Sequence, residues 1–320
     1  MGHGAGIEIP RSRDTKQASR HPVLERSSAF QGRDLLSIDV EDYFHVEAFA
    51  DRVSRADWPQ FIPRVRRNTE RILELLTQYQ QTATFFVLGW VAEREPGLVR
   101  AIADAGHELA CHSHVHRRVF TLAPREFRDD LRRAKAAIED AGGRQVLGYR
   151  APTFSIRRDS LWALEILAEE GFLYDSSIFP IRHDLYGMPG APRFVYEHAL
   201  SNRMSIIEVP PSTMRLFGVN LGVAGGGYLR HLPMSYTRWG MRQIHQEKQP
   251  VNVYFHPWEI DPEQPRMEAR LKSRIRHYRG LKNTEPRLRK LLAEGAFERI
   301  IDYVRRYLQQ GSSDGSLSNS

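Results

Sequence analysis

The stretch Glu108-Leu109-Ala110-Cys111-His112-Ser113-His114-Val115-His116 joins a short apolar run to three imidazoles at alternating positions. The short apolar run that ends at Leu109-Ala110 predicts a strand at 108–110 that leads into the histidines. Burial of an imidazole costs free energy unless both ring nitrogens find partners. Three histidines this close together therefore indicate a functional site more than a part of the hydrophobic core. His112 and His116 are four residues apart, would lie on one face of a helical turn, and could bind one metal ion together. The alternative is a solvated, histidine-rich loop.

A metal site also needs anionic ligands, and the first candidates upstream are carboxylates. They stand in Ser37-Ile38-Asp39-Val40-Glu41-Asp42. The apolar run at 35–40 predicts a buried strand that leads directly into them. Polar groups at the end of a buried strand are where α/β folds place their chemistry, so this segment and the histidines are candidates for one site.

Strand and helix patterns alternate along most of the chain. The predicted helices cover 63–79, 96–105, 124–141, 159–170 and 233–246, and the further predicted strands cover 82–88, 146–149, 172–174, 205–209 and 251–255. This alternation implies an α/β fold with a parallel sheet and outer helices, either open or closed into a barrel. Arg150, Asp175 and His256 stand at further strand ends, and a barrel would gather these ends on one face.

Residues 178–250 break the alternation with several prolines and with Gly225-Gly226-Gly227. The three glycines predict a tight loop where the backbone approaches another group closely. A functional lid and a plain connector fit this composition equally well.

Charge is distributed unevenly along the 320 residues. The net charge is +7, and residues 262–310 alone contain 13 Lys and Arg against 6 Asp and Glu. A solvated helical face explains this better than a partner site, so no nucleic-acid partner is expected, although an anionic membrane surface would suit the same charge. The single cysteine excludes an intrachain disulfide. No apolar leader or span of about 18 apolar residues is visible, which predicts a cytoplasmic protein without a transmembrane segment.

The polar strand ends resemble the motifs of the polysaccharide deacetylases, the NodB-homology group or carbohydrate esterase family 4. Motif one, usually Thr-Phe-Asp-Asp-Gly, is similar to residues 37–42, and motif two, His-Ser/Thr-x-x-His, is similar to residues 112–116. Motif three, Arg-x-Pro-Tyr/Phe, resembles Arg150-Ala151-Pro152-Thr153-Phe154 with one extra residue, and a late strand ends in His256. A narrower resemblance is to the subfamily found at exosortase-associated (PEP-CTERM) exopolysaccharide loci. Its motifs are similar to Tyr174-Asp175-Ser176-Ser177-Ile178 and Phe255-His256-Pro257-Trp258-Glu259.

This resemblance implies a deformed (β/α) barrel with fewer than eight strands. It would cover residues 33–261, with 262–310 as a basic helical extension packed on it and with disordered tails at 1–32 and 311–320. The implied cofactor is one divalent metal ion, zinc in the first place, with cobalt or another divalent ion as alternatives.

The resemblance also implies roles for individual residues. His112 and His116 would bind the metal, and because Val40 occupies the place of the family's second Asp, Glu41 or Asp42 would be the carboxylate ligand. The predicted catalytic residues are the general base Asp39, the general acid His256, Arg150, which would orient Asp39, and Asp175. Asp175 would be either the partner of His256 or a capping residue.

Such a set of residues suffices for metal-assisted hydrolysis of an amide. The resemblance implies removal of the N-acetyl group from an amino sugar in an exopolysaccharide or its precursor, so an N-acetylated oligo- or polysaccharide is the expected partner. The alternatives are an amidohydrolase that acts on a small non-sugar amide and a catalytically inactive polysaccharide-binding homologue.

Overall fold

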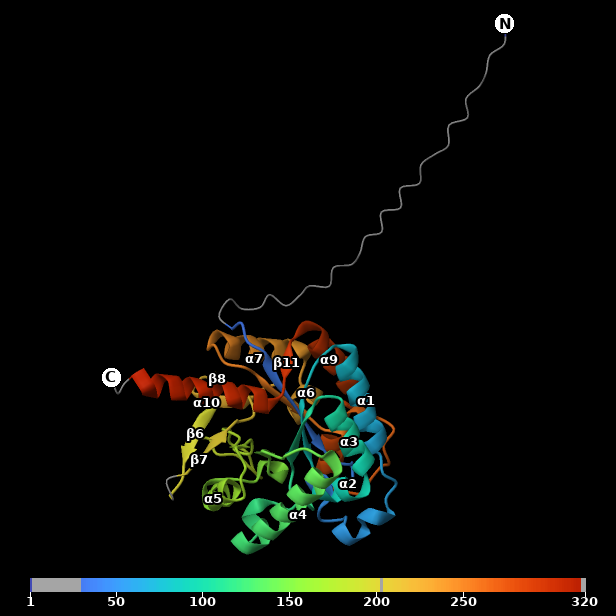
Figure 1. The fold of residues 1–320 in the computed structure, drawn as a ribbon. Coiled ribbons are helices and arrows are strands. Elements are labelled where there is room, and N and C mark those ends of the chain that lie inside the picture. The colour runs from blue at the N-terminus through green and yellow to red at the C-terminus, as the bar shows by residue number, and fades with distance from the viewer. Residues whose placement is uncertain (2–29, 202–203, 318–320) are drawn as a thin grey trace.

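The structure is a computed structural model that describes Met1 and residues 30–201 and 204–317, so nearly all of the predicted tail at 1–32 lies outside the described residues. Its main sheet forms an incomplete barrel with helices around it (Figure 1). In spatial order the strands are β10 (Asn252–Phe255), β1 (Asp34–Val40), β2 (Thr84–Val87), β3 (Glu108–Cys111), β4 (Gly148–Tyr149), β5 (Tyr174–Asp175), β7 (Ser205–Glu208) and β6 (Tyr196–Ala199). Neighbouring strands are parallel except β6 and β7. The predicted fold class is confirmed.

The two faces of the sheet have different roles. The helices are α1 (Val65–Gln78), α2 (Gly89–Arg94), α3 (Pro96–Asp104), α4 (Pro124–Gly142), α5 (Trp162–Glu169), α6 (Gly226–His231), α7 (Met234–Gln246), α8 (Leu271–Tyr278), α9 (Leu281–Glu294) and α10 (Ile300–Leu317). Because side chains alternate along a strand, Leu36, Ile38 and Val40 of β1 join the large core beneath the outer helices. Ser37 and Asp39 of the same strand point into the barrel, where the strand ends can collect polar groups.

The predicted extension at 262–310 helps to build the barrel, in addition to packing on it. β11 (Phe297–Glu298) pairs with the first residues of β1. Ile300, Ile301 and Val304 of α10 pack inside the barrel, in a cluster with side chains of β1, β2 and β3. A strand of two residues is too short to show a periodic pattern in the sequence, which is why only helical structure was predicted here. α10 also continues to Leu317, beyond the predicted boundary at 310.

The glycines at 225–227 lie against β10. Gly225 forms an isolated parallel bridge with Tyr254 of β10, and Tyr254 N donates to Ala224 O (3.3 Å). A Cβ atom on Gly225 would lie 2.0 Å from the Tyr254 ring, so a larger residue cannot occupy this position. The predicted close backbone approach is therefore confirmed. The neighbouring hairpin of β8 (Thr213–Leu216) and β9 (Val219–Gly222) was not predicted.

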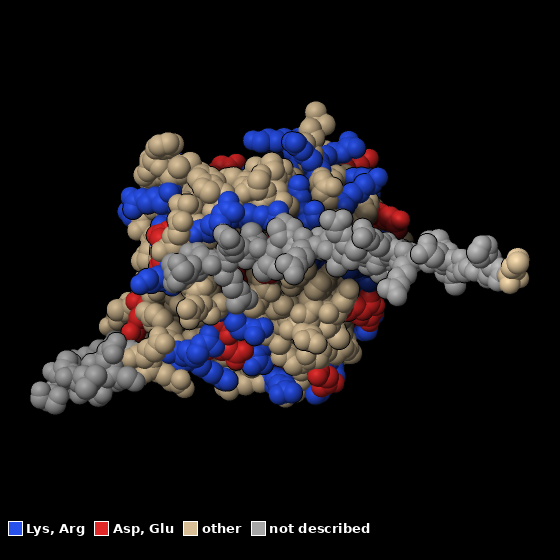
Figure 2. All heavy atoms as spheres, turned by 90° about the horizontal axis from the view of Figure 1, so that it is seen from above, with Lys and Arg blue, Asp and Glu red and all other residues tan. Residues whose placement is uncertain are grey.

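The excess of basic residues is mixed with acidic ones on the surface. Figure 2 shows the face above α7, β11 and α9 of Figure 1, where Asp and Glu side chains lie among the Lys and Arg side chains. Glu285 of α9, for example, forms ion pairs with Arg71 (2.8 Å) and Arg289 (2.8 Å). Within the described part of the chain, no helix is both long enough and apolar enough to cross a membrane.

Candidate active site

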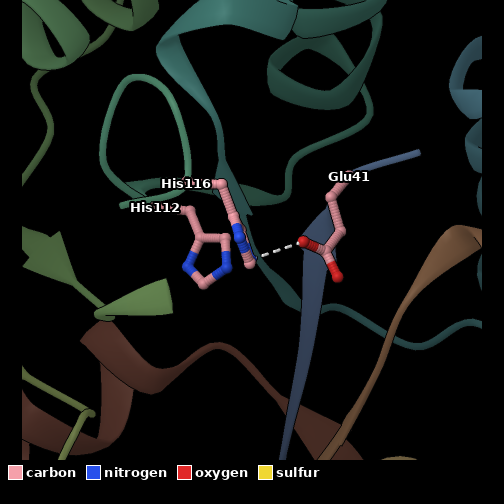
Figure 3. Close-up of side chains that lie close together, drawn as sticks. All are labelled: Glu41, His112 and His116. Carbon is pink, nitrogen blue, oxygen red and sulfur yellow. Dashed lines mark ion pairs between the residues drawn. The ribbon is translucent and has the colours of Figure 1, made fainter. Parts of the chain in front are cut away.

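Polar side chains from the ends of β1 and β3 meet at one end of the barrel, as the sequence predicted. Glu41, His112 and His116 are buried, and each offers one ligand atom such that these atoms all lie within 4.8 Å of one another. Figure 3 shows the two imidazoles turned toward the Glu41 carboxylate. One carboxylate oxygen and two imidazole nitrogens are a common ligand set for a divalent metal that keeps open positions.

The histidines lie in an irregular loop, so the prediction of a helical turn for His112 and His116 is wrong. Ser113 (φ 68°) and His116 (φ 50°) both adopt left-handed backbone conformations. Asp130 of α4 stabilises this loop by accepting hydrogen bonds from the Ser113 hydroxyl (2.6 Å) and from the next backbone N–H (2.8 Å). Arg55 donates to the His116 carbonyl oxygen (3.1 Å). Asp130 and Arg55 are supporting residues that the sequence pattern did not reveal, because they are distant in sequence.

A neutral imidazole is available at His112. Its Nδ1 lies 2.8 Å from the Arg150 carbonyl oxygen, which can only accept, so Nδ1 carries the proton and Nε2 keeps its lone pair. Burial lowers the pKa of His112 to about 4. Metal binding needs the unprotonated nitrogen, so the surroundings of His112 suit a metal ligand.

The two candidate carboxylate ligands, Glu41 and Asp42, point in different directions. Glu41 Oε2 lies 2.8 Å from His116 Nε2, yet it makes no hydrogen bond of acceptable geometry. Burial opposes ionisation of Glu41, but His116 and His256 hold its pKa well below the usual value. Asp42 turns away, and its Oδ2 accepts two backbone N–H groups at the start of α1 (2.6 and 2.9 Å). The structure thus brings Glu41, and not Asp42, to the histidines.

Asp39 forms a buried ion pair with Arg150. Arg150 Nη1 lies 2.7 Å from Asp39 Oδ1 and also donates to the Ser37 hydroxyl (2.9 Å). A second guanidinium nitrogen, Nη2, donates to the hydroxyl of Ser176 (2.9 Å). Arg150 is fully buried, so these contacts fix the orientation of Asp39, and Asp39 Oδ2 faces His256 Nε2 at 3.7 Å.

The partner of His256 is Glu259. Its Oε1 lies 2.6 Å from His256 Nδ1, whereas His256 Nε2 faces Glu41 at 3.5 Å. Burial opposes the positive charge, but the carboxylates of Glu41, Glu259 and Asp39 outweigh it and raise the pKa of His256 to about 9. This role of Glu259 was not predicted, although a carboxylate three residues after a strand-end histidine, in Phe255-His256-Pro257-Trp258-Glu259, is a usable signal.

Asp175 belongs to a different cluster. Its Oδ1 accepts a hydrogen bond from the Ser177 hydroxyl (2.5 Å), and it lies beside the buried Glu208 of β7. Burial raises the pKa of both carboxyls, and the neighbouring Asp175 adds to the effect on Glu208. Among the described residues, no ion pair joins Asp175 to His256; Asp175 instead accepts hydrogen bonds from Ser177, two residues later, and caps no helix.

The polar side chains that meet at this end of the barrel line one cleft with a volume of about 970 Å³. Its lining includes Asp39, Glu41, His112, His116 and His256, together with several aromatic side chains. A cleft of this size is large enough for a substrate of several rings.

Two segments of the chain match models of known protein families. Residues 57–170 match a family model described as polysaccharide deacetylase, and residues 176–305 match a domain of unknown function, DUF3473. Residues 108–116 lie within the first segment, and residues 251–259 lie within the second.

Curated relatives are similar over part of their length. A peptidoglycan deacetylase-like protein of Gibberella zeae is 29% identical over 154 residues, which are 44% of this chain and 45% of that protein. A peptidoglycan deacetylase of Helicobacter pylori is 32% identical over 34% of this chain and 36% of that protein. A chitooligosaccharide deacetylase of Bradyrhizobium is 31% identical over 31% of this chain and 43% of that protein. The chain thus matches less than half the length of each of these relatives.

Solved structures share the fold. A putative polysaccharide deacetylase from Mycobacterium smegmatis has a TM-score of 0.58 at 21% identity and covers 88% of this chain and 92% of its own. A probable polysaccharide deacetylase from Pseudomonas aeruginosa has a TM-score of 0.54 at 15% identity, over 86% of this chain and 90% of its own. Residues 57–170 are thus similar in sequence to polysaccharide deacetylases, and the chain shares the fold of solved polysaccharide deacetylase structures.

Proposed function

We propose that this protein is a metal-dependent deacetylase that removes the N-acetyl group from an amino sugar in an exopolysaccharide or its precursor. The observation that carries the proposal is the convergence of three groups in one cleft: the Glu41, His112 and His116 cluster, the Asp39–Arg150 pair and the His256–Glu259 pair. The assignment to the exosortase-associated subfamily and an action in the cytoplasm, before export of the polymer, belong to the same proposal.

The residues present fit a divalent metal ion. Glu41 Oε2 is a buried oxygen without a hydrogen-bond partner, and it faces an imidazole nitrogen at 2.8 Å. The Nε2 lone pair of His112 is also free for coordination, because Nδ1 is occupied by a carbonyl oxygen. Glu41, His112 and His116 would therefore hold the ion, with zinc preferred for a ligand set of two nitrogens and one oxygen. When bound, such an ion polarises a carbonyl group and lowers the pKa of a water molecule.

The remaining residues supply the proton transfers. Asp39 would accept the proton of the attacking water through Oδ2, because Arg150 occupies Oδ1. His256 would donate a proton to the leaving amine. Its raised pKa, about 9, keeps the acid form populated at neutral pH, and Glu259 fixes the ring so that Nε2 faces Asp39 and Glu41.

The size of the cleft favours a sugar polymer over a small amide. An allantoinase also shares the fold, with a TM-score of 0.56 at 15% identity, so the barrel by itself does not decide the substrate. A cleft of about 970 Å³ leaves room for more than one sugar ring beside the metal ligands. A catalytically inactive homologue would be expected to lack one of the site residues, whereas Asp39, Glu41, both histidines and His256 are all present.

Acetate release from short N-acetylglucosamine oligomers tests the proposal. The full chain is assayed after chelation and again after addition of zinc or cobalt, with Asp39→Asn as the matched variant, since Asn preserves size and removes the base. We expect activity that metal restores and that Asp39→Asn lowers by at least about a hundredfold.

Two results would contradict parts of the proposal. Stoichiometric metal binding without acetate release from any oligomer would rule out these N-acetyl sugars and favour a small non-sugar amide. A protein that binds no zinc or cobalt, measured by elemental analysis after dialysis, would rule out the metal-dependent mechanism itself.

A further inference from the structure

A buried arginine without a carboxylate partner lies in the wall of the cleft. Arg230 of α6 is only 4% exposed, and its Nε and Nη1 atoms have no hydrogen-bond partner. A buried guanidinium that leaves two N–H groups unsatisfied is costly, because each group has lost its contact with water. The cost is recovered when a ligand in the cleft accepts those hydrogen bonds.

The surroundings of Arg230 fix it close to the proposed metal ligands. Its Nη2 donates to the Arg276 carbonyl oxygen of α8 (2.9 Å), and its guanidinium carbon lies 4.8 Å from the centre of the Trp258 ring. Trp258 Nε1 in turn donates to Glu41 Oε1 (3.2 Å). Trp258 thus contacts both Arg230 and Glu41, so a single indole ring separates Arg230 from the proposed metal ligand Glu41.

Other arginines of the cleft have their charge compensated. Arg118 pairs with Glu47 (3.4 Å), and Arg270 pairs with Asp51 (3.7 Å). In the described part of the chain, neither Arg230 nor Arg276 forms an ion pair with a carboxylate, and the Arg276 guanidinium contacts only a His183 nitrogen (3.1 Å). One wall of the cleft, formed by α6 and α8, therefore carries two guanidinium groups that form no ion pair with a carboxylate of the described residues.

Burial lowers the pKa of Arg230 and the charge of Glu259 opposes this effect, so Glu259 is the candidate for an internal partner. Its Oε1 is occupied by His256 Nδ1 at 2.6 Å, and its Oε2 has no hydrogen-bond partner. Because no ion pair joins Glu259 to Arg230, the free N–H groups of Arg230 remain available to a ligand that carries its own negative charge.

We infer that Arg230, with Arg276 beside it, forms an anion subsite of the cleft, and that the substrate carries an oxyanion, a carboxylate or a phosphate, close to the acetamido sugar. A guanidinium suits this task because it presents a planar pair of N–H donors to two oxygens. The inference rests on the proposed function for the nature of the sugar, but the anion subsite can be measured without any turnover.

Isothermal titration calorimetry measures the affinity of the subsite for anionic sugars directly. The zinc-loaded full chain is titrated with glucuronate, glucose 1-phosphate and neutral glucose, and the first two identify the carboxylate and the phosphate source. We expect at least one anionic sugar to bind tenfold more tightly than glucose. Arg230→Met should remove this difference and Arg230→Lys should retain part of it. Arg274→Met is the matched control, because Arg274 is an exposed arginine of α8 outside the cleft and its loss should leave anion binding unchanged.

Substrate preference is the second readout. Acetate release is compared for N-acetylglucosamine tetramer, a hyaluronan tetrasaccharide with glucuronate between the amino sugars, and UDP-N-acetylglucosamine with its pyrophosphate. We expect one anionic substrate to exceed the neutral tetramer at least tenfold in kcat/KM, through a lower KM, and Arg230→Met to abolish this preference. If Arg230→Met fails to fold, as judged by circular dichroism, Arg230→Lys and Arg276→Met carry the test.

The outcomes separate the subsite from the proposed function. Equal binding of glucose and both anionic sugars, or anion binding that survives Arg230→Met and disappears on chelation, would overturn the subsite. A variant that moves the pH profile and leaves substrate preference intact would also overturn it, because Arg230 would then act through Glu259. Anion binding that depends on Arg230, without acetate release from any substrate, would support the subsite and contradict the deacetylase proposal.

Discussion

The loop of His112 and the segment of His256 each place a buried histidine in the site, but their surroundings favour opposite protonation states of the imidazole. Both histidines follow a parallel strand and lie close to Glu41, and burial opposes the charged form of both. His112 Nδ1 faces the carbonyl oxygen of Arg150, and burial lowers its pKa to about 4. His256 Nδ1 faces the carboxylate of Glu259, and the surrounding carboxylates raise its pKa to about 9.

This difference shows that the group facing Nδ1 decides whether the imidazole can act as a metal ligand or as an acid. A neutral acceptor leaves a lone pair for a metal, whereas an anionic acceptor stabilises the imidazolium, which can act as an acid. One residue type therefore serves both proposed roles within a single cleft.

Removal of the neutral imidazole should have the largest effect. His112→Ala deletes one of three proposed ligands, so we expect loss of stoichiometric zinc and a fall in kcat/KM of at least about a thousandfold, equivalent to about 4 kcal/mol of transition-state stabilisation. Elemental analysis and acetate release measure both effects. His114→Ala, in the same loop, is the control and should keep its zinc. A His112→Ala protein that retains zinc would show that this histidine is not a ligand.

Removal of the charged imidazole should reduce the rate and spare the metal. His256→Ala is expected to lower kcat roughly a hundredfold to ten-thousandfold, because general acid catalysis is lost, with zinc content unchanged. If zinc were lost together with activity, His256 would belong with the metal ligands and the contrast between the two histidines would fail.

The carboxylate behind His256 can be neutralised with little change in shape. In the wild type, His256 is protonated below its raised pKa, so activity that needs the acid should decline as pH rises through about 9. Glu259→Gln removes one of the charges that raise this pKa and should move the alkaline limb toward the ordinary value of about 6.5, with a loss of roughly tenfold at pH 8. The pH dependence of kcat/KM measures this, and an unmoved limb would argue against Glu259 as the cause.

The smallest effect is expected at the carboxylate that points away from the site. Asp42→Ala removes the acceptor of two N–H groups at the start of α1, so we expect a loss of about 1 kcal/mol in the free energy of unfolding. Urea unfolding measures this loss, whereas zinc content and acetate release should stay near the wild-type values. Glu41→Gln is the paired variant and should instead lose zinc. The reverse pattern would make Asp42 the ligand.

The sequence predicted the long elements because each has its own period. The apolar runs of β1, β2 and β10 and the amphipathic pattern of α4 are local signals, and their approximate bounds agree with the structure. The two-residue β11 and the hairpin of β8 and β9 gave no such signal, because each is too short or too exposed to show a period.

The site was predictable in its membership and less so in its contacts. Asp39, His112, His116 and His256 were expected at strand ends and line one cleft, and Arg150 is bound to Asp39 behind it, whereas the equally expected Asp175 lies in a different cluster. The choice between Glu41 and Asp42 depends on the start of α1, more than twenty residues later, to which Asp42 is bound. Such a contact between distant segments leaves no trace in local residue spacing.

The pairing of β1 with β10 and β11 has a consequence for how the protein is made. During synthesis β1 leaves the ribosome before every other strand of the sheet, yet its neighbours β10 and β11 leave last. Arg33 Nε, just before β1, donates to Phe297 O across 264 positions of the sequence. Because pairings between such distant segments form late and slowly, His256 reaches Asp39 and Glu41 only when nearly the whole chain has emerged. The proposed active site is therefore completed only on a nearly finished chain.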